Sequence, residues 1–442
     1  MKILIITAFV EGAGGGTGRV AYDMAKAFSN EHEVALVCPN EKTGIIRKEG
    51  NLTIYGIKSV TVQKNKDLSF SWWSPKEKKE FYNFIEEFSP DVIHSHQPIN
   101  IDTVALKYAT KNSIPFFYTG HILPSQALVF FLPGKIAKPI NNLLSKSVLK
   151  SYFKAYLDYC DGIVALNKSS YEDHKKIISS QKLHIIQNGK DLRKFYKGDF
   201  PKIEEKKKKL LFVGYISKRK NQEFLIDVMK YLPEDEFELN LVGPTLSSQY
   251  LKDVKEKIEE SKLKNINIVG AVDYEKLPKY YKESHIFVSA ATLEVQSLVI
   301  IEALSSGTPV VGLSNETIDE VIINGENGYK LPKDASPKEF AERIMKIASL
   351  DQQNYEKMCK NAYESSKVFD WDNVIEKTIQ MYQEAKKEHL EKKRRELLRL
   401  NAIERANEAF YSSAYLVAAS FVLFKKALTK QRIKFRRRHQ LT

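Results

Sequence analysis

The sequence predicts an α/β protein in which two doubly wound domains face each other across a cleft, followed by a basic helical C-terminal tail. Three observations predict this fold class. A chain of 442 residues is too long for one ordinary hydrophobic core. Short β-branched runs alternate with amphipathic helical segments, as in parallel sheets covered on both faces. The alternation stops at a lysine-rich spacer, PKIEEKKKK at 201–209, and then starts again.

The first half of the chain opens with a strand, a glycine-rich loop and a helix at GRVAYDMAKAFSN, residues 18–30. The expected strands share runs of Val, Ile, Leu and aromatic residues that end at polar or small residues. These strand segments are KILIITAF (2–9), HEVALVCP (32–39), DVIHSHQP (91–98), PFFYTGH (115–121) and DGIVALN (161–167). We therefore assign residues 1–200 to an N-terminal domain.

The second half repeats the order of strand, loop and helix, beginning with LLFVGYISKRKNQEFLIDVMKYL at 210–232. Further strands are expected at FELNLVGP (237–244), INIVG (266–270), HIFVSAA (285–291) and TPVVGL (308–313). Residues 206–368 are assigned to a second domain and residues 369–385 to a helix that packs back on the body. In open α/β sheets ligands bind beyond the carboxyl ends of the strands, so the chemistry is expected in the facing loops.

Composition indicates a globular protein, because 43% of the residues are apolar and 28% are charged. The three cysteines, Cys38, Cys160 and Cys359, are scattered and form no CxxC pair. This pattern argues against a disulfide framework or a zinc ribbon and suits a reducing cytosol. The N-terminal MKILIITAFVEG lacks a small-residue cleavage site, so we expect a buried first strand rather than a signal peptide.

The positive charge is concentrated in the tail. Residues 386–442 carry 16 Lys and Arg against 5 Asp and Glu, a net charge of +11 out of +14 for the chain. Such an asymmetry indicates contact with an anionic surface. We expect a membrane rather than a nucleic acid, because the apolar segment AFYSSAYLVAASFVLF at 409–424 precedes the last basic run.

The apolar segment 409–424 is too short to span a bilayer, since 16 helical residues reach only about 24 Å and the hydrocarbon core is about 30 Å thick. We expect an interfacial helix flanked by basic residues. Packing on the body or self-association are the alternatives. A second membrane-facing element is a helix with Lys146, Lys150 and Lys154 along one edge, beside the apolar run 129–132; its alternative is an ordinary solvated helix.

Several motifs lie at expected strand ends. The loop EGAGGGTGR, with Gly15 and Gly16, opens a helix and can bind an anion, although alone it is also typical of a tight turn. FVGYISKRKNQ places Lys220 just past a strand-end glycine. LEVQSLVIIEALSSGTPVVG, residues 293–312, carries two glutamates, Glu294 and Glu302, eight positions apart.

Together with DVIHSHQP, YTGH and IIQNGKDLRKF, these motifs resemble the family 4 glycosyltransferases, which have the GT-B fold with two Rossmann-like domains and are retaining, nucleotide-sugar-dependent enzymes. The resemblance covers residues 1–385 and is strongest in the E-x7-E segment. It implies that the N-terminal domain binds the acceptor and that the second domain binds the donor.

The resemblance also implies roles for the acidic segment. The first glutamate, Glu294, faces the hydroxyls of the donor sugar, and Glu302 holds the ribose hydroxyls. The amides of Ser297, Leu298 and Val299 are expected to be free at the helix start and to receive the phosphates of the donor. A glycosidase-type acid and nucleophile pair is disfavoured, because it needs two carboxyls about 5–10 Å apart across one bond.

Basic residues complete the implied site. Lys220 matches the lysine that neutralises the diphosphate leaving group. Tyr215 stands where the family commonly has arginine, so Lys218 or Arg219 supplies the second charge or Lys220 acts alone. His121 matches a histidine beside the transferred sugar.

Two more histidines, His94 and His96, lie on one side of a strand. With no third ligand in view they are interpreted as packing and cleft-lining residues, and no metal or cofactor is expected. Asn188-Gly189 is interpreted as a turn near the cleft without chemistry.

The sequence thus predicts a peripheral-membrane, retaining glycosyltransferase on the cytoplasmic face of the cell membrane. It would move a hexose-type sugar from a UDP- or GDP-sugar to a lipid or lipid-linked glycan. The alternatives are transfer to a soluble acceptor, a nucleotide-sugar epimerase of the same fold, and a non-enzymatic sugar-nucleotide-binding scaffold.

Overall fold

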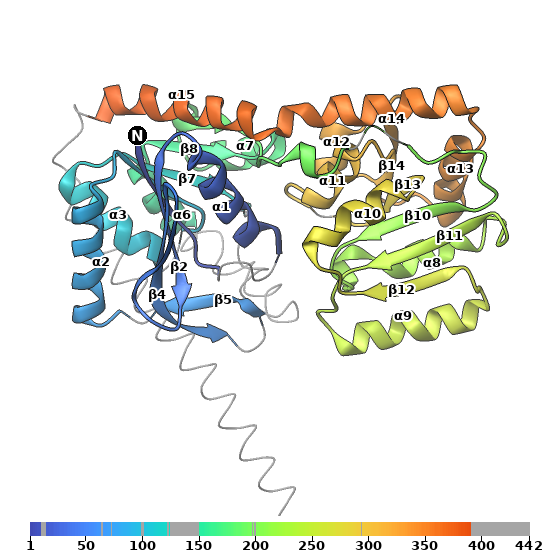
Figure 1. The fold of residues 1–442 in the computed structure, drawn as a ribbon, viewed down its shortest axis with the longest axis horizontal. Helices are drawn as coiled ribbons and strands as arrows, with labels where there is room; N and C mark the ends of the chain where they lie inside the picture. Colours follow the sequence, from blue (N-terminus) through green and yellow to red (C-terminus); the bar gives the residue numbers. More distant parts are fainter. Residues whose placement is uncertain are drawn as a thin grey trace, which may run out of the picture.

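The computed structural model of the chain is shown in Figure 1. It describes residues 1–9, 15–62, 65–71, 73–98, 101–121, 123, 150–196, 198, 200–292 and 294–389. The apolar run 129–132, Lys146 and the segment 409–424 lie outside the described residues.

The N-terminal domain is built on a nine-stranded sheet with the order β3-β4-β2-β1-β6-β7-β8-β9, to which β5 adds through β4. Its strands are β1 (Lys2–Ile6), β2 (Glu33–Asn40), β3 (Gly44–Glu49), β4 (Leu52–Val62), β5 (Asn65–Ser71), β6 (Val92–Ser95), β7 (Phe116–Gly120), β8 (Gly162–Ala165) and β9 (Leu183–Ile185). All pairings are parallel except those of β3 and β5 with β4. The strands predicted in this half are confirmed, whereas β3 to β5 were not expected.

Helices cover both faces of this sheet (Figure 1). They are α1 (Gly15–Phe28), α2 (Pro75–Phe88), α3 (Ile101–Asn112), α6 (Lys150–Tyr159) and α7 (Lys168–Lys175). In α2 the start is fixed by a capping box, in which Ser74 and Glu77 bond each other's backbone amides. The helix then buries Phe81, Ile85 and Phe88 against the sheet.

The C-terminal domain has a six-stranded parallel sheet with the order β12-β11-β10-β13-β14-β15. The strands are β10 (Lys208–Val213), β11 (Phe237–Val242), β12 (Ile266–Gly270), β13 (Ile286–Ser289), β14 (Val310–Leu313) and β15 (Gly328–Leu331). In sequence order this is the 3-2-1-4-5-6 arrangement of a doubly wound sheet, which binds ligands where the strand order reverses. Here the reversal lies between β10 and β13.

The helices of the second domain are α8 (Gln222–Met229), α9 (Ser248–Ser261), α10 (Leu277–Lys282), α11 (Leu298–Ser305), α12 (Glu316–Val321), α13 (Pro337–Ala348) and α14 (Gln352–Ser366). Helix α11 is buried along Ile300, Ile301 and Leu304 and carries Glu302, the second glutamate of the E-x7-E segment. Its position between the sheet and the first domain brings the acidic segment to the domain junction (Figure 1).

The last described helix, α15 (Trp371–His389), returns to the N-terminal domain (Figure 1). It packs Val374, Met381 and Tyr382 into the core cluster that also contains Phe28 and Phe117. The helix continues four residues beyond the end expected at 385. Along the described part of the chain, no helix is long and apolar enough to cross a membrane.

The chain crosses between the domains twice, and the two crossings pair with each other. Lys190 and Asp370 form an isolated parallel bridge, and the Lys190 amide donates to the Phe369 carbonyl at 2.7 Å. Gly189 allows this approach, because a Cβ there would lie 2.1 Å from the Trp371 ring. We call residues 188–190 and 369–371 the crossing segments.

Candidate functional site

Two glycines shape the loops that follow the central strands of the second sheet. Gly214 and Gly243 follow β10 and β11 with φ values of 147° and 140°. A Cβ at Gly243 would lie 2.1 Å from the Gly214 carbonyl oxygen, so the two loops touch through their backbones. Buried Gln222 braces the first loop by bonding Tyr215 O at 2.9 Å, and Tyr215 itself is partly buried. Because the loop is packed in this way, the 3₁₀ turn Lys218–Lys220 lies at the domain junction.

Lys220 and Arg219 converge on Glu294. The Lys220 ammonium lies 2.7 Å from Glu294 Oε1, and the Arg219 guanidinium lies 3.4 Å from the same oxygen. Glu294 and Lys220 are buried, whereas the Arg219 side chain is 46% exposed. The Glu316 carboxylate lies close by and accepts a hydrogen bond from the Glu294 amide at 3.3 Å. An anion that takes over part of the Glu294 contact would still meet two cations. The structure thus brings together three residues that were predicted to share the site.

Glu294 lies on the loop before α11, and Glu302 lies within the helix, as predicted. The expectation that the Ser297 amide is free is wrong, because it donates to Thr317 Oγ1 at 2.8 Å. Thr317 belongs to α12, and no local pattern predicted its contact with the start of α11. The amides of Leu298 and Val299 remain in the first helical turn, where an α-helix offers no acceptor of its own.

Glu302 is enclosed by residues that sequence reasoning did not connect to it. Lys190 Nζ donates to Glu302 Oε1, and Tyr281 donates to Oε2 at 2.8 Å. The Lys190 and Glu302 side chains are only 3% and 4% exposed. Burial first, and then the charge of Glu302, raise the pKa of Tyr281 well above its usual value, so its hydroxyl stays protonated as a donor.

Lys190 contacts Glu302, but its position in the sequence did not predict this contact. It directly follows Asn188-Gly189, which was interpreted as a turn without chemistry. The available signal was a lysine placed immediately after a strand-end Asn-Gly pair. Its partner lies 112 residues away, so no local pattern could have identified the contact.

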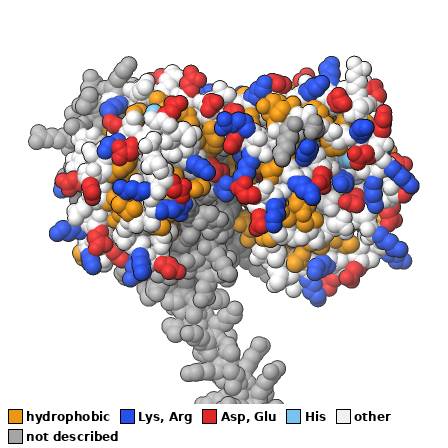
Figure 2. All heavy atoms as spheres, in the orientation of Figure 1, with side chains coloured by type: hydrophobic (Ala, Val, Ile, Leu, Met, Phe, Trp, Pro, Cys, Tyr) orange, Lys and Arg blue, Asp and Glu red, His pale blue; other side chains and the backbone are white. Residues whose placement is uncertain are grey.

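Tyr274 connects the two domains beside Glu302. The Arg19 guanidinium of α1 lies 4.1 Å from the centre of the Tyr274 ring, and the Lys190 ammonium lies 4.7 Å from it. Arg19 is also held by Asp23, one turn further along α1. Space-filling Figure 2 shows side chains of both charges along the junction of the two halves. Cation–π contacts of this kind attract the domains toward each other.

Gly15 and Gly16 are the first two residues of α1, and the preceding residues 10–14 lie outside the described ranges. Their predicted contact with an anion therefore stays a prediction. The helix does reach the domain junction, because Arg19 in its second turn contacts the second domain.

Three histidines form a stack on the N-terminal side. The His96 ring stacks on His94 and on His121, with centroid distances of 5.2 and 5.0 Å. His96 Nδ1 and His121 Nε2 share a hydrogen bond of 2.8 Å. Desolvation by burial lowers the pKa of His94 and of His121 to about 3. All three rings are thus hydrogen-bonding groups without charge at neutral pH, because the pKa of His96 is also lowered by burial.

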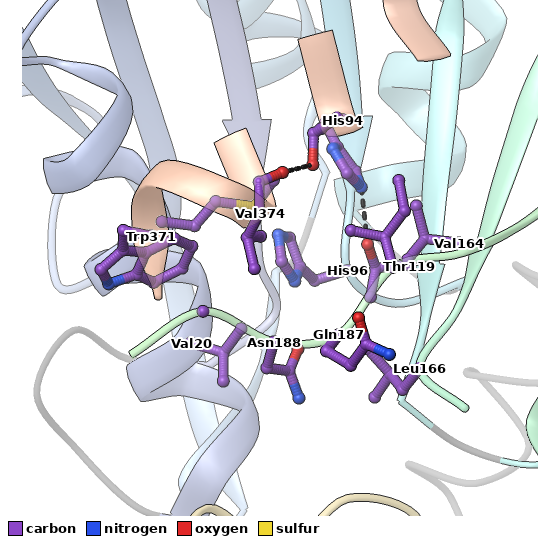
Figure 3. A pocket seen from close by; sticks show the side chains of 14 residues that line it. Val20, His94, His96, Thr119, Val164, Leu166, Gln187, Asn188, Trp371 and Val374 are labelled. Atoms are coloured by element: carbon purple, nitrogen blue, oxygen red, sulfur yellow. Dashed lines mark hydrogen bonds between the residues drawn. The ribbon is translucent and has the colours of Figure 1, made fainter. Parts of the chain in front are cut away.

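A small pocket lies beside this stack (Figure 3). His94 is fully bonded there, to Tyr382 at 2.6 Å and to Thr119 at 2.7 Å. The pocket is also lined by His96, by Asn188 and by Trp371 of the crossing segments. The interpretation of His94 as a packing residue agrees with these contacts.

The loop that carries Glu294 is bonded to the first domain. Asn167 Nδ2 donates to the Val295 carbonyl, and the Asn188 amide donates to Gln296 Oε1 at 2.8 Å. Within the described residues, no three His, Cys, Asp or Glu side chains group in a way that could hold a metal ion. The three cysteines are buried and form no disulfide with one another.

Two parallel-sheet domains that oppose their ligand-facing loops define the class of GT-B proteins. The family described as Glycosyltransferase Family 4 matches residues 14–194, and that described as Glycosyl transferases group 1 matches residues 197–365. The two matches together span both domains. The chain belongs to the family 4 glycosyltransferases.

Two named proteins are similar in sequence to this chain. The alpha-monoglucosyldiacylglycerol synthase of Acholeplasma laidlawii is 26% identical over 277 residues, which is 57% of this chain and 65% of the relative. A probable sucrose-phosphate synthase of Thermosipho melanesiensis is 26% identical over 320 residues, 68% of this chain and 73% of the relative. The chain therefore matches less than two thirds of the length of the first of these proteins.

Solved structures show the same fold. Anabaena HepE in complex with UDP superposes with a TM-score of 0.65 at 17% identity, over 87% of this chain and 100% of that structure. The fold and the family are thus established by independent comparisons, one of structure and one of sequence.

Proposed function

We propose that this chain is a retaining glycosyltransferase that moves a hexose-type sugar from a UDP- or GDP-sugar to a lipid or lipid-linked glycan at a membrane surface. The observation that carries the proposal is the placement of two glutamates around the start of α11. Glu294 stands among cations on the loop, and Glu302 stands within the helix beside hydrogen-bond donors.

The charges suit a nucleotide diphosphate sugar. Lys220, Arg219 and the first-turn amides of α11 offer positive potential to the diphosphate, and the leaving nucleotide gains negative charge as the sugar departs. Lys220 would exchange part of its contact with Glu294 for the phosphate. Glu294 would then accept hydrogen bonds from the sugar hydroxyls, and Glu302 from the ribose. His121, as a neutral ring, would contact the sugar without adding charge.

A lipid acceptor is supported by two separate observations. The Acholeplasma laidlawii relative is named for the synthesis of a glucosyldiacylglycerol. The basic tail and its apolar segment 409–424 carry the composition of a membrane-surface element. The Thermosipho melanesiensis relative, named as a probable sucrose-phosphate synthase, favours transfer to a soluble sugar as the second candidate.

Donor use is tested by thermal-shift screening of the purified chain against UDP- and GDP-sugars, because a ligand that binds only the folded protein stabilises it. The protein is then incubated with the nucleotide sugar that stabilises it, together with either diacylglycerol vesicles or soluble sugars. The product distinguishes the two acceptor classes. A new glycolipid supports the proposal, and a product with soluble sugars alone replaces it with the second candidate. Conversion of the donor to another nucleotide sugar without an acceptor would indicate an epimerase.

The membrane contact is tested by a truncation after His389, which leaves α15 whole and removes residues 390–442 with a net charge of +10. The truncated chain should bind donor normally but sediment less with anionic vesicles at low salt, because each basic residue near such a surface contributes about 1 kcal/mol. Equal sedimentation of the two forms would assign the tail to self-association or packing.

A further inference from the structure

Lys190 lies in a crossing segment, yet its ammonium ends inside the second domain. Its backbone amide bonds Phe369 O of the other crossing segment at 2.7 Å. Its side chain passes the rings of Phe195 and Tyr274, with the ammonium 5.2 and 4.7 Å from their centres. The ammonium then meets Glu302 as a buried ion pair. One residue therefore touches both the connection between the domains and the second glutamate of the E-x7-E segment.

The carboxylate of Glu302 is bonded at both of its oxygens. Lys190 occupies Oε1 and Tyr281 occupies Oε2, so the carboxylate is held at both oxygens. Tyr274 also hydrogen-bonds this carboxylate. Because each carboxylate oxygen has two lone pairs, the three contacts leave acceptor capacity for one further hydroxyl. A buried carboxylate without a cation would be costly and would tend to take up a proton. Lys190 thus keeps Glu302 oriented and able to accept hydrogen bonds.

The crossing segment 188–190 is also bonded to the loop that carries Glu294. The Asn188 amide donates to Gln296 Oε1 at 2.8 Å, two residues after Glu294. The segment 188–190 is therefore bonded to residues 296 and 302, on both sides of the α11 start. A movement of this crossing segment would move both contacts together.

We infer that Lys190 is a positioning residue that sets Glu302 for the donor ribose and ties this carboxylate to the crossing segments. The inference rests on the proposed function, which assigns the ribose hydroxyls to Glu302. It adds a residue to that site, since Lys190 acts through Glu302 without contacting the donor. A purely structural ion pair would contribute to stability but would leave donor affinity unchanged.

The test is a double-mutant cycle on donor affinity, measured by calorimetry with UDP-glucose or GDP-mannose, whichever the wild-type chain binds. Lys190→Met should weaken binding roughly 10- to 100-fold, as expected when a charged hydrogen-bonding partner is lost. In the Glu302→Gln background, the same Lys190→Met change should alter affinity less than about threefold, because its target is already neutral. The double variant has no unpaired buried charge, so its comparison with Glu302→Gln stays informative if Lys190→Met alone fails to fold.

A pH profile separates positioning from stability. In Lys190→Met, Glu302 faces the neutral hydroxyls of Tyr281 and Tyr274, with Arg19 beyond the Tyr274 ring. Because removal of the cation favours the protonated carboxyl, UDP-sugar binding by Lys190→Met should weaken more steeply with falling pH than binding by the wild type. Lys194→Met is the matched control, since Lys194 also lies over Tyr274, at 4.6 Å, but pairs with exposed Glu275. This control should bind donor within about twofold of the wild type.

The outcomes are distinguishable. Unchanged donor affinity in Lys190→Met with reduced stability would overturn the inference and leave the proposed function intact. An equal loss from Lys190→Met in both backgrounds would show that Lys190 does not act through Glu302. Absence of binding by the wild-type chain to any nucleotide sugar would overturn the proposed function and this inference with it.

Discussion

The two sides of the domain junction differ in how they carry charge. On the C-terminal side, Lys220 and Arg219 surround Glu294, and Lys190 pairs with Glu302. On the N-terminal side, His94, His96 and His121 form a neutral stack, because burial lowers the pKa of each ring. The first arrangement suits an anionic diphosphate, and the second suits hydroxyl groups that need hydrogen bonds without charge.

The two glutamates within the C-terminal side also differ from each other. Glu294 lies on a loop with two cations, one of which is about half exposed. Glu302 lies in a helix and is held by Lys190 and by the hydroxyls of Tyr281 and Tyr274. The first can exchange its partners when an anion binds, whereas the second is held in one arrangement. Mutations should therefore affect turnover at the first and stability together with affinity at the second.

The largest effect is expected from Glu302→Ala. Removing this carboxylate leaves the Lys190 ammonium buried without its partner, which should reduce the free energy of unfolding by about 3–5 kcal/mol. Donor affinity should fall as well. Urea denaturation measures the first effect, with Glu275→Ala as the control because its Lys194 pair is exposed. A loss below about 1 kcal/mol, the size of a surface pair, would contradict the buried environment of Glu302.

Lys220→Met should mainly reduce turnover. Loss of a preorganised group that stabilises a developing negative charge typically costs about 3–4 kcal/mol, or 10²- to 10³-fold in kcat. The matched control is Lys218→Met, because Lys218 is exposed on the same 3₁₀ turn. Steady-state kinetics with the stabilising donor decide the result. Similar effects of the two variants would mean that the position of Lys220 carries no special role.

Glu294→Gln should distinguish the proposed role of Glu294 from that of Glu302. The amide removes the charge that holds Lys220 and Arg219 but preserves the shape of the side chain. Turnover should fall about tenfold or more, while affinity for the free nucleoside diphosphate should be retained, because the proposed contact is with the sugar. Calorimetry with the free nucleotide and with the nucleotide sugar makes the comparison. An equal loss for both ligands would reverse the assignments of Glu294 and Glu302.

The absence of charge on buried His94 can be tested through the pH dependence of the free energy of unfolding. The pKa of His94 falls to about 3 on folding, so the unfolded chain takes up a proton between about pH 6.5 and 3 that the folded chain does not. This contribution lowers stability as the pH falls, by about 1.4 kcal/mol per pH unit below 6.5. It should be missing in His94→Gln, so the stability of this variant should depend less steeply on pH.

Urea denaturation of both forms at pH 7, 6 and 5 measures this difference. Buried Asp102, whose pKa is raised by desolvation, acts in the opposite direction, but it is present in both forms and cancels in the comparison. Parallel pH dependences would mean that His94 is charged in the folded protein.

The smallest effect is expected from Arg19→Ala. The Arg19 to Tyr274 contact joins the two sides, and exposed cation–π contacts contribute about 0.5–1 kcal/mol. The two domains should remain folded and separate more readily, which small-angle scattering can detect. Lys26→Ala on the same helix provides the control. An unchanged scattering profile would assign the domain contact to the crossing segments and to the bond from Asn167 to Val295.

The sequence by itself determined the alternation of strands and helices, the position of Glu294 before α11 and of Glu302 within it, and the basic tail. These features depend on residues close together in the chain, where burial periods and helix starts leave a local pattern. Strands β3 to β5 were not predicted, although the 11-residue run LTIYGIKSVTV of β4 carries a strand signal. The flanking strands β3 (GIIRKE) and β5 (NKDLSFS) carry a weaker one.

Only the tertiary structure decided which residues meet. The pair Lys190 and Glu302 is separated by 112 residues, and His96 meets His121 because β6 and β7 are neighbours in the sheet. The Ser297 amide is occupied because α12 brings Thr317 against it. Such contacts follow from strand order and from the pairing of the two crossing segments, and neither is written in the sequence near these residues. The physical reason is that a local pattern records how much of a side chain is buried, whereas the identity of its partner depends on how distant segments pack.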